Sequence, residues 1–162
     1  MTRVDLTLPL VAALLLLAGL LTLSTAAPGD EFARQLVFLL PAAVAVGLLL
    51  WVGRERLMRF APHAYVVSIA LLVAVQVFGT EVNGAKSWLY VGPLPGFQPS
   101  EIAKLALILA LASVLHDRPI RRWLDYVLPA VLIGVPVGLV LIEPDLGGAL
   151  VLLAIGGGMV LV

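Results

Sequence analysis

Residues 98–115 read QPSEIAKLALILALASVL, a run in which two ionisable side chains enter an otherwise apolar stretch. Its apolar part predicts a membrane-spanning helix that begins at Pro99, because proline suits the first helical position. Glu101 and Lys104 are three positions apart and therefore lie on one face of this helix. Ionisable groups inside a span are costly unless they are paired or face a polar cavity. We expect either a functional ion pair, or a structural arrangement in which Glu101 stabilises the helix start and Lys104 reaches the lipid headgroups.

The composition of the whole chain indicates an integral membrane protein. Of its 162 residues, 62% are hydrophobic and 12% are charged, about half the charged share of soluble domains. The formal net charge is zero, which predicts no nucleic-acid partner. The absence of cysteine excludes a disulfide framework and a thiolate site, and the two histidines lie in separate loops. We therefore expect no metal centre built from histidine or cysteine.

Six apolar stretches are long enough, or nearly so, to cross a bilayer as α-helices. They predict an all-α fold, a polytopic transmembrane helical bundle, in which residues 1–162 form a single transmembrane domain. The first stretch is too long for the core of a cleaved signal peptide and is expected to remain. The predicted spans are 8–27, 32–52, 61–79, 99–115, 126–142 and 146–162.

Arginine placement predicts the orientation of these spans. Arg3 precedes the first span, arginine clusters follow the second and fourth, and the alternate loops hold only Arg34 and Lys86. Positively charged loops stay in the cytoplasm, so we expect the N-terminus to be cytoplasmic. The loop 80–98 and the turn after residue 142 then face the outside.

A second polar segment, Glu143-Pro144-Asp145, separates the last two predicted spans. Asp145 precedes an apolar helix, where its carboxylate is expected to cap free backbone amides. Lining of a polar cavity is a second interpretation that is compatible with the first. The two carboxylates could also bind a divalent cation or a sugar hydroxyl.

The fifth predicted span combines prolines at 129 and 136 with Gly134 and Gly138. Proline bends a membrane helix and leaves a backbone carbonyl free. Glycines four positions apart permit close approach of another helix. The glycines at 156–158 in the sixth span indicate close packing or flexibility.

Two segments carry a resemblance to a known family. Residues 83–115, NGAKSWLYVGPLPGFQPSEIAKLALILALASVL, resemble the signature of the SEDS family (shape, elongation, division and sporulation). Residues 143–149, EPDLGGA, are similar to that family's Pro-Asp-Leu-Gly segment and follow in the family's order. Residues 97–104, FQPSEIAK, are closer to the RodA, rod-shape elongation branch. Members have about ten helices, so we expect this chain, with six, to be the N-terminal part of a longer protein.

The resemblance implies a glycosyltransferase of the bacterial cytoplasmic (inner) membrane that polymerises lipid II at the outer face and releases undecaprenyl pyrophosphate. The family's principal aspartate lies in a later outer loop, beyond Val162, so this chain alone is expected to be inactive. Six residues match positions with implied roles: Glu101, Lys104 and Asp145 as supporting cavity residues, and Lys86, Trp88 and Gln98 as substrate-binding residues.

The loop 80–98 contains three aromatic residues, Trp88, Tyr90 and Phe97, of the kind that lie at a membrane interface. From the residues alone, interfacial anchoring and substrate contact are equally open. The resemblance favours an ordered re-entrant or amphipathic loop beside the site.

The resemblance also implies partners, namely a class B penicillin-binding protein and membrane lipids. No cofactor follows from the sequence, although a divalent cation would suit pyrophosphate chemistry. A flippase for lipid-linked saccharides and a noncatalytic scaffold of the wall machinery are the alternatives. Transporters often carry repeated halves, and no internal repeat is visible. A scaffold would tolerate joint neutralisation of Glu101 and Lys104.

Overall fold

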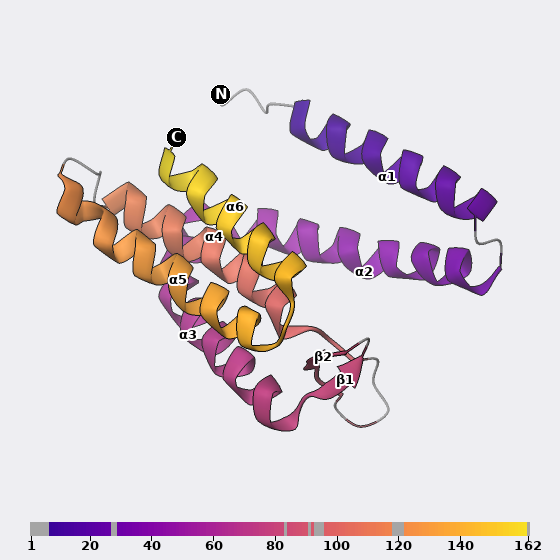
Figure 1. Cartoon of the computed structure of the whole chain (residues 1–162). Helices are drawn as coiled ribbons and strands as arrows, with labels where there is room; N and C mark the ends of the chain where they lie inside the picture. The colour runs from indigo at the N-terminus through magenta and orange to yellow at the C-terminus, as the bar shows by residue number, and fades with distance from the viewer. Residues whose placement is uncertain are drawn as a thin grey trace. The chain divides into compact units, whose positions relative to one another are not determined.

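The protein is described by a computed structural model, shown in Figure 1. It divides into two compact units, residues 1–52 and 53–162. The single transmembrane domain stays a prediction. The structure describes residues 7–26, 29–82, 84–90, 92, 96–117 and 122–161.

The first unit consists of two apolar helices that pack against each other, α1 (Thr7–Ala26) and α2 (Asp30–Val52). Both are long and apolar enough to cross a membrane. Most of their described leucine and valine side chains are exposed, as expected of helices surrounded by lipid. Their bounds agree closely with the first two predicted spans.

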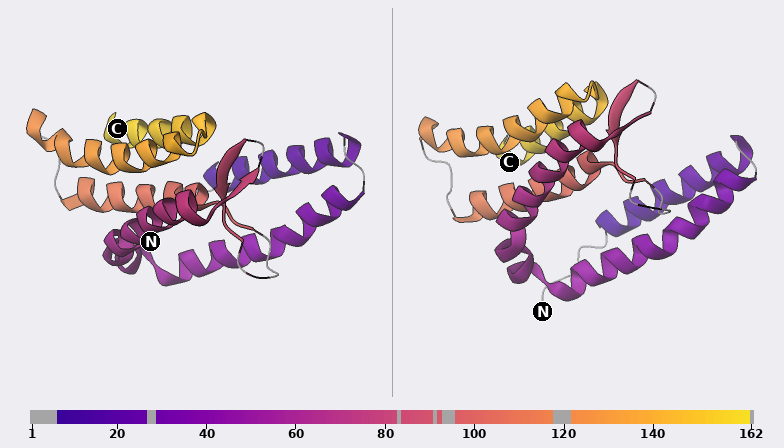
Figure 2. Two further views of the ribbon diagram at one scale, coloured as in Figure 1. Left: turned by 60° about the horizontal axis from the view of Figure 1, so that its bottom comes forward. Right: turned by 90° about the horizontal axis from the view of Figure 1, so that it is seen from below.

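The second unit is a bundle of four helices, in which α4 packs against each of the other three. Figure 2 shows α4 between α3 on one side and α5 and α6 on the other. After Ser100, the buried side chains of α4 are small alanines and leucines, and the leucines are completely buried. The four helices are α3 (Arg54–Phe78), α4 (Pro99–Asp117), α5 (Val127–Ile142) and α6 (Leu146–Leu161).

The all-α, polytopic prediction is confirmed. Five described helices are long and apolar enough to span a bilayer, and α6 is a shorter apolar helix. With 16 residues, α6 is about 24 Å long, against a hydrocarbon core of about 30 Å. A short 3₁₀ helix, η1 (Trp123–Tyr126), leads into α5.

The third helix begins at Arg54, whereas the third span was predicted from residue 61. Hydropathy locates the apolar part of a helix, and the first turns of α3 carry arginines that are good helix formers but not apolar. Gly53 separates α2 from α3 with a φ of 77°, a backbone conformation that other residues rarely adopt. The arginines assigned to the end of the second span therefore belong to α3.

The structure describes most of the loop 80–98, and whether this loop is re-entrant or amphipathic in the membrane stays a prediction. It contains an antiparallel hairpin of β1 (Thr80–Val82) and β2 (Ala85–Trp88), followed by a bridge between Leu89 and Phe97. Gly84 lies in the hairpin turn with a φ of 82°, as two-residue hairpin turns require. The Asn-Gly pair was the signal for this turn, but the strands were too short to show a period-two pattern.

The proline at position 136 frees a backbone carbonyl, as predicted, and another helix uses it. Pro136 has no N–H to donate to the carbonyl of Leu132, and the Tyr65 hydroxyl of α3 donates to that oxygen at 2.9 Å. One turn from the other end of α5, the Gln76 amide donates to the Leu139 carbonyl at 3.4 Å. Two hydrogen bonds thus fix α3 against α5.

Close helix approach occurs at a different glycine from the pair that the sequence indicated. Gly134 and Gly138 are exposed, and a Cβ at either would meet no described atom within 4 Å. Gly156 of α6 is buried, and a Cβ there would lie 2.5 Å from Cγ1 of Ile133 on α5. The prediction for the glycines at 156–158 is therefore confirmed as close packing at Gly156, and the expected approach at 134 and 138 is not seen among the described residues.

We expect Gly156→Ala to destabilise the bundle by about 1–3 kcal/mol, the usual cost of overpacking. The β-branched side chain of Ile133 has few rotamers with which to move aside. Gly157→Ala is the matched control, because a Cβ at Gly157 meets nothing within 4 Å. Thermal unfolding in detergent should separate the two variants, and equal midpoints would contradict the packing described for α5 and α6.

Candidate functional site

The polar segments singled out in the sequence gather at one end of the second unit. This motif end comprises the β1–β2 hairpin, the first turns of α4 and the turn between α5 and α6, and Figures 1 and 2 show these elements together. The antiparallel course of the helices produces this arrangement, because α3 and α5 end where α4 and α6 begin. Both sequence motifs therefore lie at the same end of the bundle, as predicted.

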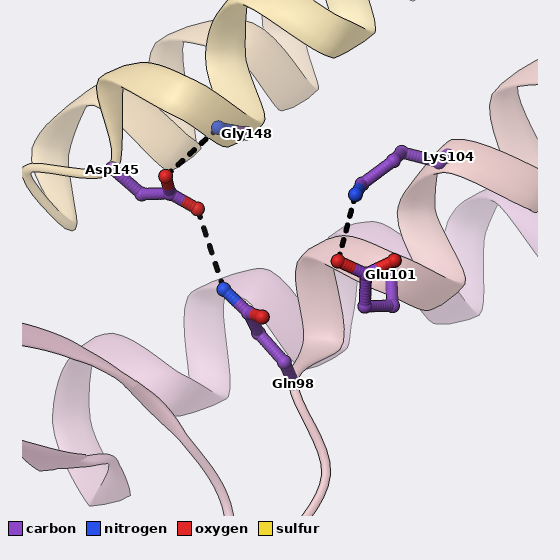
Figure 3. Close-up of polar contacts among 5 residues, drawn as sticks. All are labelled: Gln98, Glu101, Lys104, Asp145 and Gly148. Atoms are coloured by element: carbon purple, nitrogen blue, oxygen red, sulfur yellow. Dashed lines mark hydrogen bonds and ion pairs between the residues drawn. The ribbon is translucent and has the colours of Figure 1, made fainter. Parts of the chain in front are cut away.

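Asp145 connects the two motifs through its two carboxylate oxygens, as Figure 3 shows. Oδ1 accepts a hydrogen bond from the backbone N–H of Gly148 at 2.8 Å, and Oδ2 accepts one from Nε2 of Gln98 at 3.3 Å. The first bond confirms the predicted N-cap of α6. The second joins the start of α4 to the α5–α6 turn, so Gln98 positions Asp145.

Glu101 and Lys104 form the ion pair that their spacing allows. The Lys104 Nζ lies 2.7 Å from Oε1 of Glu101, next to the first turn of α4 (Figure 3). The Lys104 side chain is 19% exposed and that of Glu101 is 63% exposed. The pair therefore neutralises a half-buried ammonium, and the alternative in which Lys104 extends alone to the headgroups is not what the structure shows.

Glu143 is the most deeply buried ionisable side chain of the motif end, at 2% exposure. Neither of its carboxylate oxygens has a hydrogen-bond partner among the described residues, and the same holds for the buried hydroxyl of Ser100. Burial, and then the charge of Asp145 two residues away, raises the pKa of Glu143 to about 7. At neutral pH a large share of the Glu143 population is therefore protonated.

Lys86 of the hairpin binds the C-terminal end of α3. Its ammonium donates hydrogen bonds to the backbone carbonyls of Gln76 and Val77, both at 3.1 Å. These carbonyls belong to the last turn of α3, where helical partners are missing and a positive charge is favourable. Lys86 thus caps α3 and attaches the hairpin to it, and its contact with a substrate phosphate stays a prediction.

Trp88 is the last residue of β2, paired with Thr80 across the hairpin, and its side chain is half-buried. Its neighbour Ser87 is buried, so the strand presents alternate residues to the bundle. A role of Trp88 in substrate binding stays a prediction, as does that of Gln98, whose amide is already engaged with Asp145.

The described side chains supply charge and hydrogen bonds, but no group of three or more His, Cys, Asp or Glu residues that could hold a metal ion occurs among them. Both oxygens of Asp145 are engaged by protein donors, while those of Glu143 are unpartnered. The divalent cation considered for this carboxylate pair stays a hypothesis. The described side chains at the start of α4 and in the α5–α6 turn offer one ammonium, two hydrogen-bonded carboxylates and a buried protonatable carboxyl.

Three features of the second unit were missed from the sequence. The burial of Glu143 was not predicted, and its signal was its position between Ile142 and a proline. Tyr65 and Gln76 are polar residues inside the apolar α3, a pattern that indicates interhelical hydrogen bonds. The partner carbonyls could not be identified without the tertiary structure.

The model of the cell cycle protein family that groups FtsW, RodA and SpoVE matches residues 5–162 of the chain. The chain belongs to this family. The resemblance to the SEDS family is thereby confirmed, and the chain is a multi-pass protein of the cytoplasmic membrane.

Individual SEDS relatives agree with this assignment. A probable peptidoglycan glycosyltransferase FtsW from Thioalkalivibrio sp. (strain K90mix) is 36% identical over 96% of this chain and 42% of its own length. The peptidoglycan glycosyltransferase MrdB of Escherichia coli (strain K12) is 42% identical over 63% of this chain and 27% of its own length. The chain thus spans less than half the length of these relatives.

A solved SEDS structure shows the same fold. The crystal structure of the rod shape determining protein RodA of Thermus thermophilus matches with a TM-score of 0.83 and 45% identity, covering 94% of this chain and 51% of RodA. A chain from a structure of a peptidoglycan synthase complex matches with a TM-score of 0.82, also at 45% identity, over 94% of this chain and 46% of its own length.

We expect Glu143 to make the stability of the protein depend on pH. Its pKa is about 7 in the folded state and 4.5 as a free side chain, so the folded state binds more protons between these values. The contribution of Glu143 to stability should therefore be largest below pH 4.5 and be lost as pH rises from 4.5 through 7, by at most about 1.4 kcal/mol per pH unit. Glu143→Gln removes this titration and should flatten the slope.

Thermal midpoints of the wild type and of Glu143→Gln in one detergent, measured from pH 4.5 to 8, provide the test. Glu81→Gln, which replaces an exposed carboxylate of β1, is the control and should keep the wild-type slope. Parallel curves for the wild type and Glu143→Gln would show that Glu143 is not buried as described.

Proposed function

We propose that the complete protein is a peptidoglycan glycosyltransferase that polymerises lipid II at the outer face of the cytoplasmic membrane, and that this chain supplies one wall of its cavity. One observation carries the proposal. The Gln98–Asp145 hydrogen bond brings the two family motifs together beside the Glu101–Lys104 ion pair. Relatives that match this chain bear the name peptidoglycan glycosyltransferase.

The proposed reaction forms one glycosidic bond and breaks one bond to a leaving group. The 4-hydroxyl of the acceptor sugar attacks the anomeric carbon of the growing strand. The bond from that carbon to undecaprenyl pyrophosphate breaks, and the hydroxyl proton passes to a base. Such a step needs a base near the hydroxyl and positive charge near the departing diphosphate.

Among the described residues of the motif end, Lys104 suits the second requirement. Its ammonium is held on α4 by the exposed Glu101 carboxylate, which an incoming diphosphate can replace as the partner. Asp145 has both oxygens engaged, so it positions the α5–α6 turn rather than accepting a proton. The base is expected to be the family aspartate beyond residue 162, and this chain alone is expected to be inactive.

The branch and the partner belong to the same proposal. RodA at 45% identity is a rod shape determining protein, which supports a role in cell elongation, whereas several curated relatives are division-type FtsW proteins. The matching chain in a peptidoglycan synthase complex supports an assembly with a class B penicillin-binding protein. A flippase and a noncatalytic scaffold remain the alternatives that the experiments must exclude.

Polymerisation of purified lipid II by the complete protein with its penicillin-binding partner tests the function. We expect Lys104→Ala to lower the rate about 100-fold, the usual effect of removing one preorganised electrostatic contact. Glu101→Ala/Lys104→Ala leaves no unpaired half-buried charge and should fold better than Glu101→Ala alone, without recovering activity. Glu81→Ala, an exposed carboxylate outside the ion pair, is the control and should polymerise normally.

Each alternative predicts a different outcome of this assay. A scaffold would allow the double variant to support wall synthesis in cells at the wild-type level. A flippase would give no polymer from a folded wild type, together with movement of labelled lipid II across vesicles. Either result would contradict the proposed enzyme.

We also propose that the N-terminus is cytoplasmic, which places the motif end outside. The chain has no cysteine, so single cysteines can be introduced at exposed positions on each side. Glu81→Cys in β1 should react with a membrane-impermeant maleimide in intact spheroplasts, and Arg122→Cys only after permeabilisation. The opposite pattern would invert the topology, and a complete protein without cysteine provides the background signal.

A further inference from the structure

A second polar arrangement lies at the opposite end of the four-helix unit from the motif end. There, Nη2 of Arg54 at the start of α3 lies 3.3 Å from Nε2 of His116 in the last turn of α4. This contact joins the two helices where they enter and leave the bundle. It therefore holds together the two walls of a cavity that lies deeper between them.

This cavity has a volume of about 170 Å³ and an almost wholly apolar lining. Two hydroxyl-bearing residues, Tyr65 and Ser113, line the cavity, and the Tyr65 hydroxyl is already donated to the Leu132 carbonyl. A cavity whose lining is almost wholly apolar favours hydrocarbon over water. The residues that line it are Pro62, Tyr65 and Val66 of α3, Ala110, Ser113 and Val114 of α4, and Leu132 of α5.

Helical spacing places two basic residues of α3, Arg59 and His63, near the end of the cavity that faces the start of α3. Arg59 precedes Pro62 by three residues and Val66 by seven, so it lies on the face of α3 that lines the cavity, about 4.5 Å along the axis from Pro62. His63 lies three residues before Val66, at the edge of the same face. Both side chains are exposed. Among the described residues, neither Arg59 nor His63 forms an ion pair or a hydrogen bond, and Glu55, one turn before Arg59, is no exception.

We propose that this cavity and the two basic residues near it bind an anionic phospholipid, with an acyl chain in the cavity and the phosphate at Arg59 and His63. Helical side chains lean toward the N-terminus of their helix, so Arg59 extends from the cavity toward the membrane surface at which α3 begins. Its guanidinium supplies a permanent charge, and the imidazole of His63 supplies a hydrogen-bond donor. The two basic side chains would thus bind the phosphate, and the cavity next to them would bind the acyl chain.

The chemistry of the two basic residues distinguishes a lipid from other apolar occupants. A transmembrane helix from elsewhere in the protein would fill the cavity but would bring no phosphate to the two basic side chains. General attraction of arginine loops to the membrane would explain Arg59 but not an apolar cavity beside it. Basic pockets between helices are a recurrent form of anionic lipid site. This site is separate from the motif end and does not depend on the proposed enzymatic reaction.

Native mass spectrometry of the complete protein, titrated with dioleoyl phosphatidylglycerol or dioleoyl phosphatidylcholine, tests the proposal. We expect the wild type to retain phosphatidylglycerol about five-fold more strongly, and Arg59→Gln/His63→Gln to abolish that preference. Arg122→Gln, an exposed arginine that does not line the cavity, is the charge control and should keep the preference.

The cavity is tested separately through its wall. Val66→Phe should occupy the cavity and weaken retention of both lipids, whereas Val67→Phe changes an equally exposed neighbour that does not line it. Three outcomes would overturn the proposal: no preference for phosphatidylglycerol in the wild type, an unchanged preference in Arg59→Gln/His63→Gln, or equal retention by Val66→Phe and Val67→Phe. A helix of the complete protein seated in the cavity would give the last of these.

Discussion

The bilayer requires every backbone polar group at membrane depth to find a partner within the protein, and the second unit depends on how that requirement is met. The carbonyl that Pro136 frees accepts the Tyr65 hydroxyl. The last carbonyls of α3 receive the Lys86 ammonium, and the first amides of α6 receive the Asp145 carboxylate. The bonds made by Tyr65 and Lys86 join one element to another, so the polar groups left over by one helix help to determine where its neighbour lies.

This requirement also divides the polar residues of the motif end into two groups. Asp145, Gln98 and Lys86 use their hydrogen-bonding capacity to hold helix ends and the hairpin, and they are positioning residues. Among the described residues, Lys104 and Glu101 bond to each other across the surface of one helix and to no second element. The fold does not need the Lys104 ammonium to join two elements, so this charge remains available to a ligand. The proposed reaction involves Lys104 for this reason.

The sequence predicted what depends on local spacing. The helices followed from apolar length, the Glu101–Lys104 pair from three-residue spacing, and the cap of α6 from an aspartate before an apolar run. It could not predict which carbonyl Tyr65 meets, or that Gly156 rather than Gly134 touches a neighbour, because both depend on the rotation of one helix against another. The burial of Glu143 could not be predicted for the same reason, because a residue in a turn becomes buried only when other elements pack around it.

The unpartnered Glu143 is consistent with a site that is completed by other groups. An ionised carboxylate without donors is unstable in a buried position, and a pKa of about 7 allows the group to remain neutral there. If the proposed function holds, an ammonium from substrate or protein, or a cation accompanying diphosphate, would lower that pKa and ionise Glu143 on binding. Glu143 lies two residues before Asp145. The negative charge of an ionised Glu143 would therefore act on the Asp145 carboxylate and on its hydrogen bond to Gln98, which joins the two motifs.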